Sequence, residues 1–392
     1  MLPGNQQLFQ QYRATLLDDV LPFWDKHSRD PQGGFFTCLD RTGEVYDTDK
    51  FVWLQGRQTW TYAMLYNRME KRPEWLAMAK HGADFLRAHG RDASGDWYFS
   101  LNREGAPLIQ PYNIFSDCFA AVGLSQYALA AGDEEAQDIA LNAFRNMLRR
   151  EHFPKGKYTK AYPGTRSLRS FAFPMMFLHV AHELEWLLPK DLFEENTRRW
   201  MNDIDTLFID KASGLVYENV APDGSHPDTF EGRLLNPGHG LEGMWFLMDA
   251  ALKRGDTALA HRAADSLLRI LEFSWDKEYG GIFGFLDARN RPCEKLEWDQ
   301  KFWWAHIETL VALLMAETRL GRTDCRPWFE KVHEYTWSHY PDPAYGEWFG
   351  YLNRRGEVAL PLKGGKWKGC YHLPRCLFMC AQMLDPAAPR PR

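Results

Sequence analysis

The sequence lacks the cysteine pattern of a disulfide framework or a structural zinc site. Its cysteines are odd in number, and no two of them form a CxxC pair. They are Cys38, Cys118, Cys293, Cys325, Cys370, Cys376 and Cys380. Scattered, unpaired cysteines are typical of reduced thiols inside a cell, so we expect a cytoplasmic protein.

Charge of one sign and long apolar runs are also scarce. The 392 residues include 47 Lys and Arg against 52 Asp and Glu, with no basic stripe, which argues against nucleic acid or a membrane surface as a partner. No uncharged apolar run is long enough to span a bilayer. The first residues, MLPGNQQLFQQYR, are too polar for a secretion signal.

Aromatic residues, in contrast, are abundant, with 16 Trp and 16 Tyr. A large core would use them. So would a cleft lined with flat faces, which is common in sugar-binding sites.

One short motif recurs along the chain: an Asp, a Gly a few residues later, a strand-like aromatic patch and a second turn signal. Its copies begin at Asp30, Asp92, Asp210, Asp276 and Asp342. The spacing is about sixty residues, with one gap twice as long. The segment Phe153 to Ser167 lies in that gap, and we interpret it as a divergent sixth copy.

Between the motifs, each period contains an apolar helix followed by a more polar, amphipathic helix. A helix that is apolar on all sides requires burial all round, whereas an amphipathic helix can lie outside it. Six such hairpins closed into a ring predict an all-α fold, an (α/α)6 barrel with strand-like loops at its rim. We expect one catalytic domain over residues 1–385 and a flexible tail over 386–392. An open helical solenoid is the alternative.

Unusual polar residues fall near the start of the apolar helices. In a closed ring these inner helices run parallel, so their N-terminal ends meet at one mouth, where residues far apart in the sequence converge. The candidates are Arg57, Tyr112, Asn113, His239, Glu242, Glu308, His372 and Arg375. Converging helix N-termini would also favour a developing anion.

His239 is flanked by Gly238 and Gly240, directly after Pro237. We expect the two glycines to let the backbone turn sharply and to leave the face of the imidazole uncovered. A capping or core histidine is the alternative. His372 also follows a glycine-rich turn, which strengthens the functional interpretation.

Two histidines, an arginine and a glutamate in one aromatic pocket suit proton abstraction beside a carbonyl. Two bases on opposite walls can invert a carbon centre, while Arg57 stabilises the enolate between them. This chemistry requires no cofactor. No histidine pair at metal-ligand spacing shares a helix with a carboxylate ligand, so no metal centre is expected.

Several long segments together resemble the N-acylglucosamine 2-epimerase (renin-binding protein) family, closest in wording to its bacterial and cyanobacterial members. They are TDKFVWLQGRQ, QPYNIFSDCFAA, ENVAPDGSHPDTFEGRLLNPGHGLE, LEWDQKFWWAHIE and YGEWFGYLNRRGEVALPLKGGKWKGCYHLPR. The resemblance covers nearly the whole chain. It implies an (α/α)6 barrel that interconverts N-acetylglucosamine and N-acetylmannosamine, in sialic acid metabolism.

The resemblance also assigns roles to individual residues. His239 and His372 become the proton-transferring pair, with Arg57 and Glu308 completing the catalytic set. Glu242, Trp304 and Arg375 would shape the sugar pocket.

A regulator and an assembly state follow from the same resemblance. It implies activation by ATP, which is not consumed, and a homodimer. The basic loop with Lys157, Lys160 and Arg166 is similar to the region proposed for that nucleotide. From the residues alone, this loop is either solvated or an anion site.

Three other functions stay open. Relatives that isomerise aldoses or epimerise cellobiose carry an Asn and a further His on the third inner helix, where this chain has Pro174, Met175 and Met176; we interpret this as favouring an acylamino sugar. A glycoside hydrolase would need two carboxylates across the cleft, for which Asp299 and Glu308 are the candidates. A non-catalytic binding protein would need no such set at all.

Overall fold

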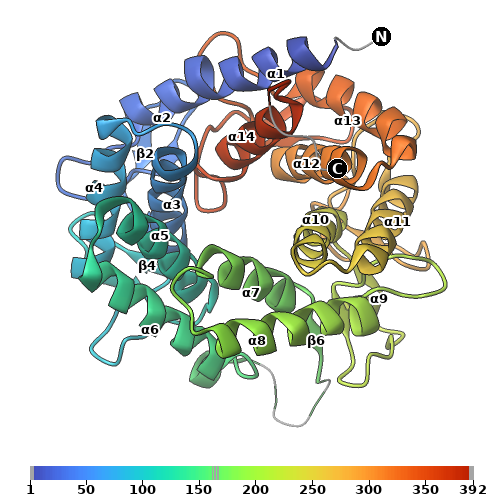
Figure 1. Ribbon diagram of the computed structural model, residues 1–392, viewed down its shortest axis with the longest axis horizontal. Helices are drawn as coiled ribbons and strands as arrows, with labels where there is room; N and C mark the ends of the chain where they lie inside the picture. The colour runs from blue at the N-terminus through green and yellow to red at the C-terminus, as the bar shows by residue number, and fades with distance from the viewer. Residues whose placement is uncertain (1–3, 161, 163–164, 166, 388–392) are drawn as a thin grey trace.

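The computed structural model describes residues 4–160, 162, 165 and 167–387. Its helices form two concentric rings around one axis (Figure 1). The inner ring consists of α3 (Val52–Arg68), α5 (Phe115–Ala131), α7 (Ala172–Glu183), α10 (Pro237–Lys253), α12 (Trp303–Leu320) and α14 (His372–Leu384). The outer ring consists of α1 (Asn5–Ala14) with α2 (Leu21–His27), then α4 (Pro73–His89), α6 (Glu134–Arg150), α8 (Lys190–Asp203), α11 (Thr257–Ser274) and α13 (Arg326–His339).

The ring closes through the two ends of the chain. The π-helical segment η1 (Thr15–Val20) joins α1 to α2, and this outer helix packs against α14 (Figure 1). The (α/α)6 barrel is therefore confirmed, and the open solenoid is wrong. The sixth hairpin combines the first outer helix with the last inner helix, because the sixth period has no outer helix after α14 within the described residues.

Burial follows the expected division between the rings. Thirteen consecutive residues of α5, from Ser116 to Ala128, are buried. The outer helix α6 instead buries one stripe that includes Ile139, Ala143 and Met147, and the Asp133 carboxylate caps its start. Burial on one face is what an outer position requires.

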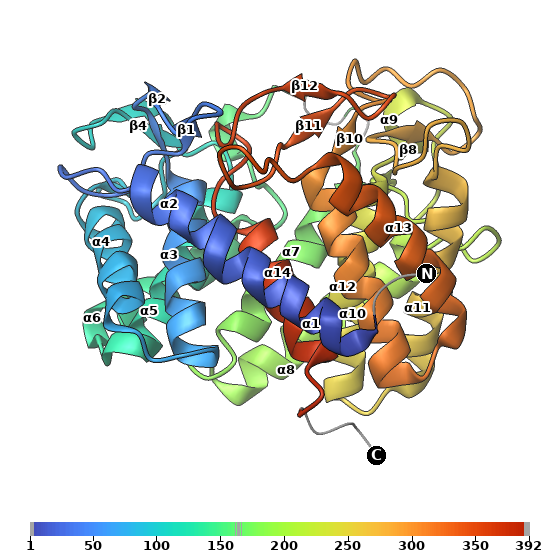
Figure 2. The ribbon, with the colours of Figure 1, turned by 90° about the horizontal axis from the view of Figure 1, so that it is seen from above.

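Short antiparallel sheets gather at one end of the barrel (Figure 2). Their strands are β1 (Cys38–Leu39), β2 (Val45–Asp47), β3 (Lys50–Phe51), β4 (Ser100–Leu101), β5 (Pro107–Ile109), β6 (Arg169–Ser170), β7 (Asn219–Val220), β8 (Leu234–Leu235), β9 (Leu286–Asp287), β10 (Lys301–Phe302), β11 (Tyr351–Leu352) and β12 (Val358–Leu360). The sheets are β1-β2, β3-β4-β5, β6-β7, β8-β9 and β10-β11-β12. Four strands that come directly before an inner helix, β3, β6, β8 and β10, each pair with a strand of the next period, so the rim links neighbouring hairpins.

The smaller elements lie in the connections between the helices. They are the π-helical η3 (Ile204–Phe208), the short helix α9 (Phe230–Arg233), and the 3₁₀ turns η2 (Gly156–Tyr158) and η4 (Thr323–Cys325).

The recurring Asp is a turn residue. Each copy accepts hydrogen bonds from backbone N–H groups two to four residues later, for example Asp30 from Gln32 and Asp276 from Glu278. A single antiparallel bridge, such as Arg29 with Phe35, closes each of the five clear copies. The divergent copy at 153–167 stays a prediction, because its described residues contain the 3₁₀ turn η2 and no such bridge.

The chain ends differ in what can be described. Helix α14 ends at Leu384, and residues 388–392 lie outside the described part, so the flexible tail stays a prediction. Within the described residues, no helix combines the length and apolarity that crossing a membrane requires.

Candidate active site

The candidate residues meet at the end of the barrel where the inner helices begin. Arg57 lies in α3, His239 and Glu242 in α10, Trp304 and Glu308 in α12, and His372 and Arg375 in α14. Four helices separated by up to three hundred residues therefore contribute to one site. The sequence predicted this convergence, and the ring produces it.

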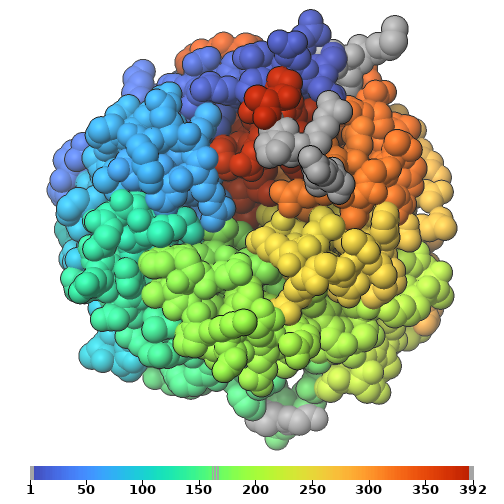
Figure 3. Space-filling view, in the orientation of Figure 1, coloured from blue at the N-terminus to red at the C-terminus, as the bar shows by residue number. Residues whose placement is uncertain are grey.

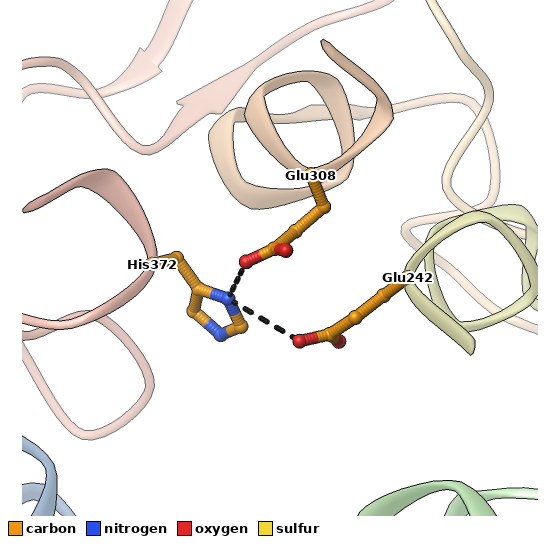
Figure 4. A group of neighbouring side chains, drawn as sticks. All are labelled: Glu242, Glu308 and His372. Atoms are coloured by element: carbon orange, nitrogen blue, oxygen red, sulfur yellow. Dashed lines mark hydrogen bonds and ion pairs between the residues drawn. The ribbon is translucent and has the colours of Figure 1, made fainter. Parts of the chain in front are cut away.

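His372 is held by a carboxylate on the neighbouring helix (Figure 4). Its Nδ1 lies 2.6 Å from Glu308 Oε1, and 3.8 Å from Glu242 Oε1. Because Nδ1 is bound to Glu308, Nε2 is the ring nitrogen that remains available to exchange a proton. Burial and then the charge of Arg57 lower the pKa of His372 well below the ordinary value. The charge of Glu242 raises the pKa of His372 but does not reverse this shift.

His239 has a carboxylate of its own. Its Nδ1 lies 2.9 Å from Glu218 Oε2, and the side chain of His239 is 28% exposed. Burial lowers the pKa of this imidazole, but the charge and the hydrogen bond of Glu218 outweigh it, so the net pKa is raised. Each imidazole is thus held by a carboxylate at Nδ1, but their pKa values are shifted in opposite directions.

Sequence reasoning missed Glu218. It is the residue before β7, in the copy of the repeated motif that begins at Asp210, twenty-one positions before its partner His239. The only available signal in the sequence was a carboxylate next to an expected rim strand, some twenty residues before the start of a helix that carries a histidine. Glu308, expected as a support for the histidine, does lie against His372.

Both imidazoles pack against one indole. The ring centroid of Trp304 is 5.6 Å from that of His239 and 5.7 Å from that of His372. His372 also meets Trp303 edge-on. Trp304 therefore sets the separation of the two bases.

The glycines beside His239 do not make a sharp turn, so that expectation is wrong. Gly238 and Gly240 lie inside α10, whose first residue is Pro237, and neither has a positive φ. A Cβ on Gly238 would lie 2.4 Å from Trp304 Cη2, whereas one on Gly240 would meet Ile270 Cδ1 at 3.0 Å. Gly238 is therefore required by the close approach of Trp304.

We expect Gly238→Ala to lower kcat/KM by about tenfold or more, because the added methyl displaces the indole that positions both imidazoles. Gly240→Ala is the matched control, since its methyl points to the outer helix α11, and we expect it to keep kcat/KM within about twofold. Steady-state kinetics and thermal unfolding of both variants provide the test. Equal losses of activity would contradict the role given to Trp304.

Arg57 is buried in an aromatic cage. Its guanidinium carbon lies 4.1 Å from the ring centroid of Phe119, 4.4 Å from Trp53 and 4.8 Å from Tyr371. Its Nε has no hydrogen-bond partner among the described residues. Burial lowers the pKa of Arg57 to about 10, so it remains a cation at neutral pH. Such a charge is available to an anion formed beside it.

Arg375 joins the two buried glutamates. Its Nη2 donates to Oε1 of Glu242 and to Oε1 of Glu308, and its Nη1 donates to the Tyr371 hydroxyl. Trp245 donates to the second oxygen of Glu308 at 2.9 Å. Both oxygens of Glu308 are thus engaged.

A metal ion could use part of this cluster. Ligand atoms of Glu242, Glu308 and His372 lie within 4.8 Å of one another. Arg375, however, already places a fixed cation against both carboxylates. The donor set is better matched to that guanidinium, and metal-independent chemistry stays a prediction.

The remaining candidates lie farther from the histidines. Tyr112 packs on Phe99, with ring centroids 5.1 Å apart, and Asn113 accepts a hydrogen bond from the Phe115 backbone where α5 begins. Their contact with substrate stays a prediction. His306 is structural, because its Nε2 accepts from the Ile282 backbone.

The predicted nucleotide loop lies between α6 and β6, outside the ring of inner helices. Lys157 and Lys160 are exposed there, and Arg166 lies outside the described residues. The contact of this loop with a nucleotide stays a prediction.

Comparisons with known proteins identify the family of this chain. Residues 34–376 match the family model for N-acylglucosamine 2-epimerase (GlcNAc 2-epimerase). The N-acylglucosamine 2-epimerase of Bos taurus is 41% identical over 95% of this chain and 90% of its own length, and the cellobiose 2-epimerase of Bacteroides fragilis is 27% identical over 97% and 99%. The solved cellobiose 2-epimerase of Bacillus thermoamylovorans has the same fold, with a TM-score of 0.82 at 19% identity over 95% of this chain and 99% of that chain. The chain therefore belongs to the N-acylglucosamine 2-epimerase family.

Proposed function

We propose that this chain interconverts N-acetyl-D-glucosamine and N-acetyl-D-mannosamine by moving one proton at C2 of the ring-opened sugar. The observation that carries the proposal is a pair of imidazoles, each oriented by a carboxylate, that both pack against Trp304. Identity of 41% to an N-acylglucosamine 2-epimerase, against 27% to a cellobiose 2-epimerase, supports the acylamino sugar as substrate.

Each step of the reaction has a residue suited to it. In the open chain, the C1 aldehyde acidifies the proton at C2. The Nε2 of one histidine removes this proton, the negative charge moves to O1, and Arg57 stabilises it. The other histidine returns a proton to the opposite face of C2, and ring closure completes the epimer. No electron acceptor or cofactor enters this balance.

Proton uptake from solvent tests the proposal. With enzyme in deuterated water, proton NMR should show N-acetylmannosamine forming from N-acetylglucosamine with deuterium at C2. Formation of the epimer with full retention of the C2 proton would reject exchange through two bases, and no epimer at all would reject the function.

The hydrolase alternative has less support. A hydrolase requires a carboxyl group free to protonate a glycosidic oxygen. Glu308 has both oxygens occupied by His372, Arg375 and Trp245. The two oriented histidines would then have no role in the reaction.

The opposite pKa shifts predict a bell-shaped pH profile. Because the pKa of His372 is lowered, this imidazole stays neutral until the pH falls far below its ordinary range, and activity is lost on the acid side when it gains a proton. Because the pKa of His239 is raised, its imidazolium persists above the ordinary range, and activity is lost on the alkaline side when it loses its proton.

Glu218→Gln isolates the alkaline limb. The amide keeps an acceptor for Nδ1 but removes the negative charge, so the pKa of His239 falls and the alkaline limb of kcat/KM moves to lower pH. We expect kcat at neutral pH to drop by about tenfold. Glu44→Gln, on an exposed turn of the first repeat, is the control. An unmoved alkaline limb in Glu218→Gln would reject the assignment of His239.

Regulation by ATP, a homodimer and a cytoplasmic location are part of the same proposal. Two exposed lysines, Lys157 and Lys160, support a nucleotide contact, and seven free cysteines support a reducing compartment.

The double variant Lys157→Ala/Lys160→Ala should raise the ATP concentration for half-maximal activation by about tenfold, with unchanged activity in the absence of ATP. Unchanged ATP activation would place the nucleotide elsewhere, and light scattering tests the dimer.

A further inference from the structure

The barrel has a cavity at the end opposite the two histidines. Its volume is about 320 Å³, and it is lined by the C-terminal halves of α3, α7, α10, α12 and α14. Figure 3 views this face, which is hollowed at its centre. The cavity is large enough for a small metabolite.

Charged side chains surround this cavity in a chain of ion pairs. Arg68 pairs with Glu183 at 2.8 Å, while Lys253 and Arg319 both pair with Asp249, at 3.0 and 2.7 Å. Three cations thus face two carboxylates. Each cation is about 40% exposed or more, whereas Glu183 and Asp249 are 9% and 21% exposed.

Three carboxylate oxygens of this set are engaged, and several N–H donors are not. Both Asp249 oxygens are engaged, and Glu183 Oε2 accepts from Arg68 and Trp60. Lys253 and Arg319 each have further N–H groups beyond the ones used in these pairs.

His182 adds an unpartnered group to the same wall. Neither of its ring nitrogens has a hydrogen-bond partner among the described residues, although the side chain is only 11% exposed. Glu185 is 3.8 Å away, too far for a hydrogen bond. Burial, and then the charge of Lys253, lower the pKa of His182 to about 4, so at neutral pH it is an uncharged ring with one free N–H.

We propose that this cavity binds a small organic anion. A carboxylate or phosphate group would accept hydrogen bonds from Lys253, Arg319 and His182, and the rest of the molecule would lie against Trp60, Phe246 and Phe378. The C-terminal ends of the inner helices carry partial negative charge, which offsets part of the attraction. We therefore expect affinity in the millimolar range.

The inner wall of the cavity is the back of the catalytic network. Arg375 and Trp245 line the cavity, and both donate to Glu308, the residue that holds His372. An anion beside Arg375 competes with Glu308 for the positive charge of the guanidinium. The carboxylate of Glu308 is then more strongly paired with His372. This raises the pKa of His372, so the acid limb of the pH profile moves to higher pH. The coupling, unlike the binding itself, rests on the proposed epimerase function.

Two opposite substitutions in one ion pair test the binding. Lys253→Gln and Asp249→Asn both break the Lys253–Asp249 pair, but they change the charge of the cavity in opposite directions. Inorganic phosphate and pyruvate are titrated calorimetrically at constant ionic strength, with glycerol as the uncharged control. We expect binding to be about threefold to tenfold weaker in Lys253→Gln and about threefold tighter in Asp249→Asn.

The control is Lys80→Gln, which breaks a one-turn pair with Asp84 on the outer helix α4 and should bind as the unaltered protein does. Phosphate and pyruvate distinguish the two anion classes, and saturable binding of either supports the site. The proposal is overturned if neither anion binds saturably, or if both cavity variants change affinity in the same direction.

Kinetic measurements test the coupling between the bound anion and His372 separately from the binding itself. With the bound anion at saturation, the acid limb of kcat/KM should move to higher pH in the unaltered protein, and less so in Lys253→Gln at the same concentration. Binding with an unmoved acid limb overturns the coupling. Failure of the NMR assay would instead reject the epimerase function, and the calorimetric result would be unaffected by it.

Discussion

Replacing either His239 or His372 with alanine is expected to lower kcat by about 10³-fold or more, because each removes one of the two groups that exchange a proton with C2. The loss should be chemical rather than structural. His239 lies near the barrel mouth with 28% of its side chain exposed, and thermal unfolding of its variant should change little. His372 is buried, so a measurable drop in stability is also expected there.

A sharper form of this experiment uses asparagine and the exchange reaction. If each histidine serves one face of C2, each single variant should still exchange the C2 hydrogen of one epimer with solvent, and the two variants should differ in which epimer they exchange. NMR of both epimers in deuterated water measures this. His306→Asn, on the same helix as Glu308, is the control, because its structural hydrogen bonds predict lost stability with kcat within about threefold. Retention of a tenth of the activity by either alanine variant would contradict the two-base mechanism.

Arg57→Met is expected to reduce kcat by about 10²–10³-fold, with little change in KM. The buried guanidinium contacts three aromatic rings and forms no ion pair with a carboxylate among the described residues. Its value to catalysis arises when negative charge develops on O1, so the loss appears in kcat. Methionine has a similar volume, and removing a buried charge should leave the free energy of unfolding unchanged or raised.

Arg57→Lys separates charge from shape. Lysine keeps the charge but loses the planar group that stacks between Trp53 and Phe119, so we expect partial recovery of kcat relative to Arg57→Met. An increase in KM at unchanged kcat in Arg57→Met would show that Arg57 binds substrate and transition state equally. That result would reject its role in stabilising the enolate.

Some of the fold was accessible from the sequence, because local patterns carried it. The recurring Asp–Gly turn marks each period, and the contrast between the apolar segment at Phe115–Ala131 and the amphipathic one at Glu134–Arg150 separates inner from outer helices. The divergent copy at 153–167 rested on spacing alone, and its described residues form no antiparallel bridge like those of the five clear copies.

In the candidate site, too, some features could be predicted from local sequence patterns and others could not. A position near the start of an inner helix was sufficient to bring Arg57, His239, Glu308 and His372 together, because a closed ring of parallel helices places those ends at one mouth. Which carboxylate holds which histidine was not accessible. Glu218 binds His239 from the residue before the rim strand β7, and Arg375 binds Glu308 from another helix.

By itself, the sequence determined the period of the chain, the two kinds of helix and the family, since these depend on local composition and on motifs that are contiguous. Tertiary structure alone decided that the first helix closes the ring against the last and that Gly238 leaves room for Trp304. It also decided that the pKa of His239 is raised while that of His372 is lowered. These features depend on distances between residues remote in the chain, and both close packing and electrostatic interactions change steeply over a few ångströms.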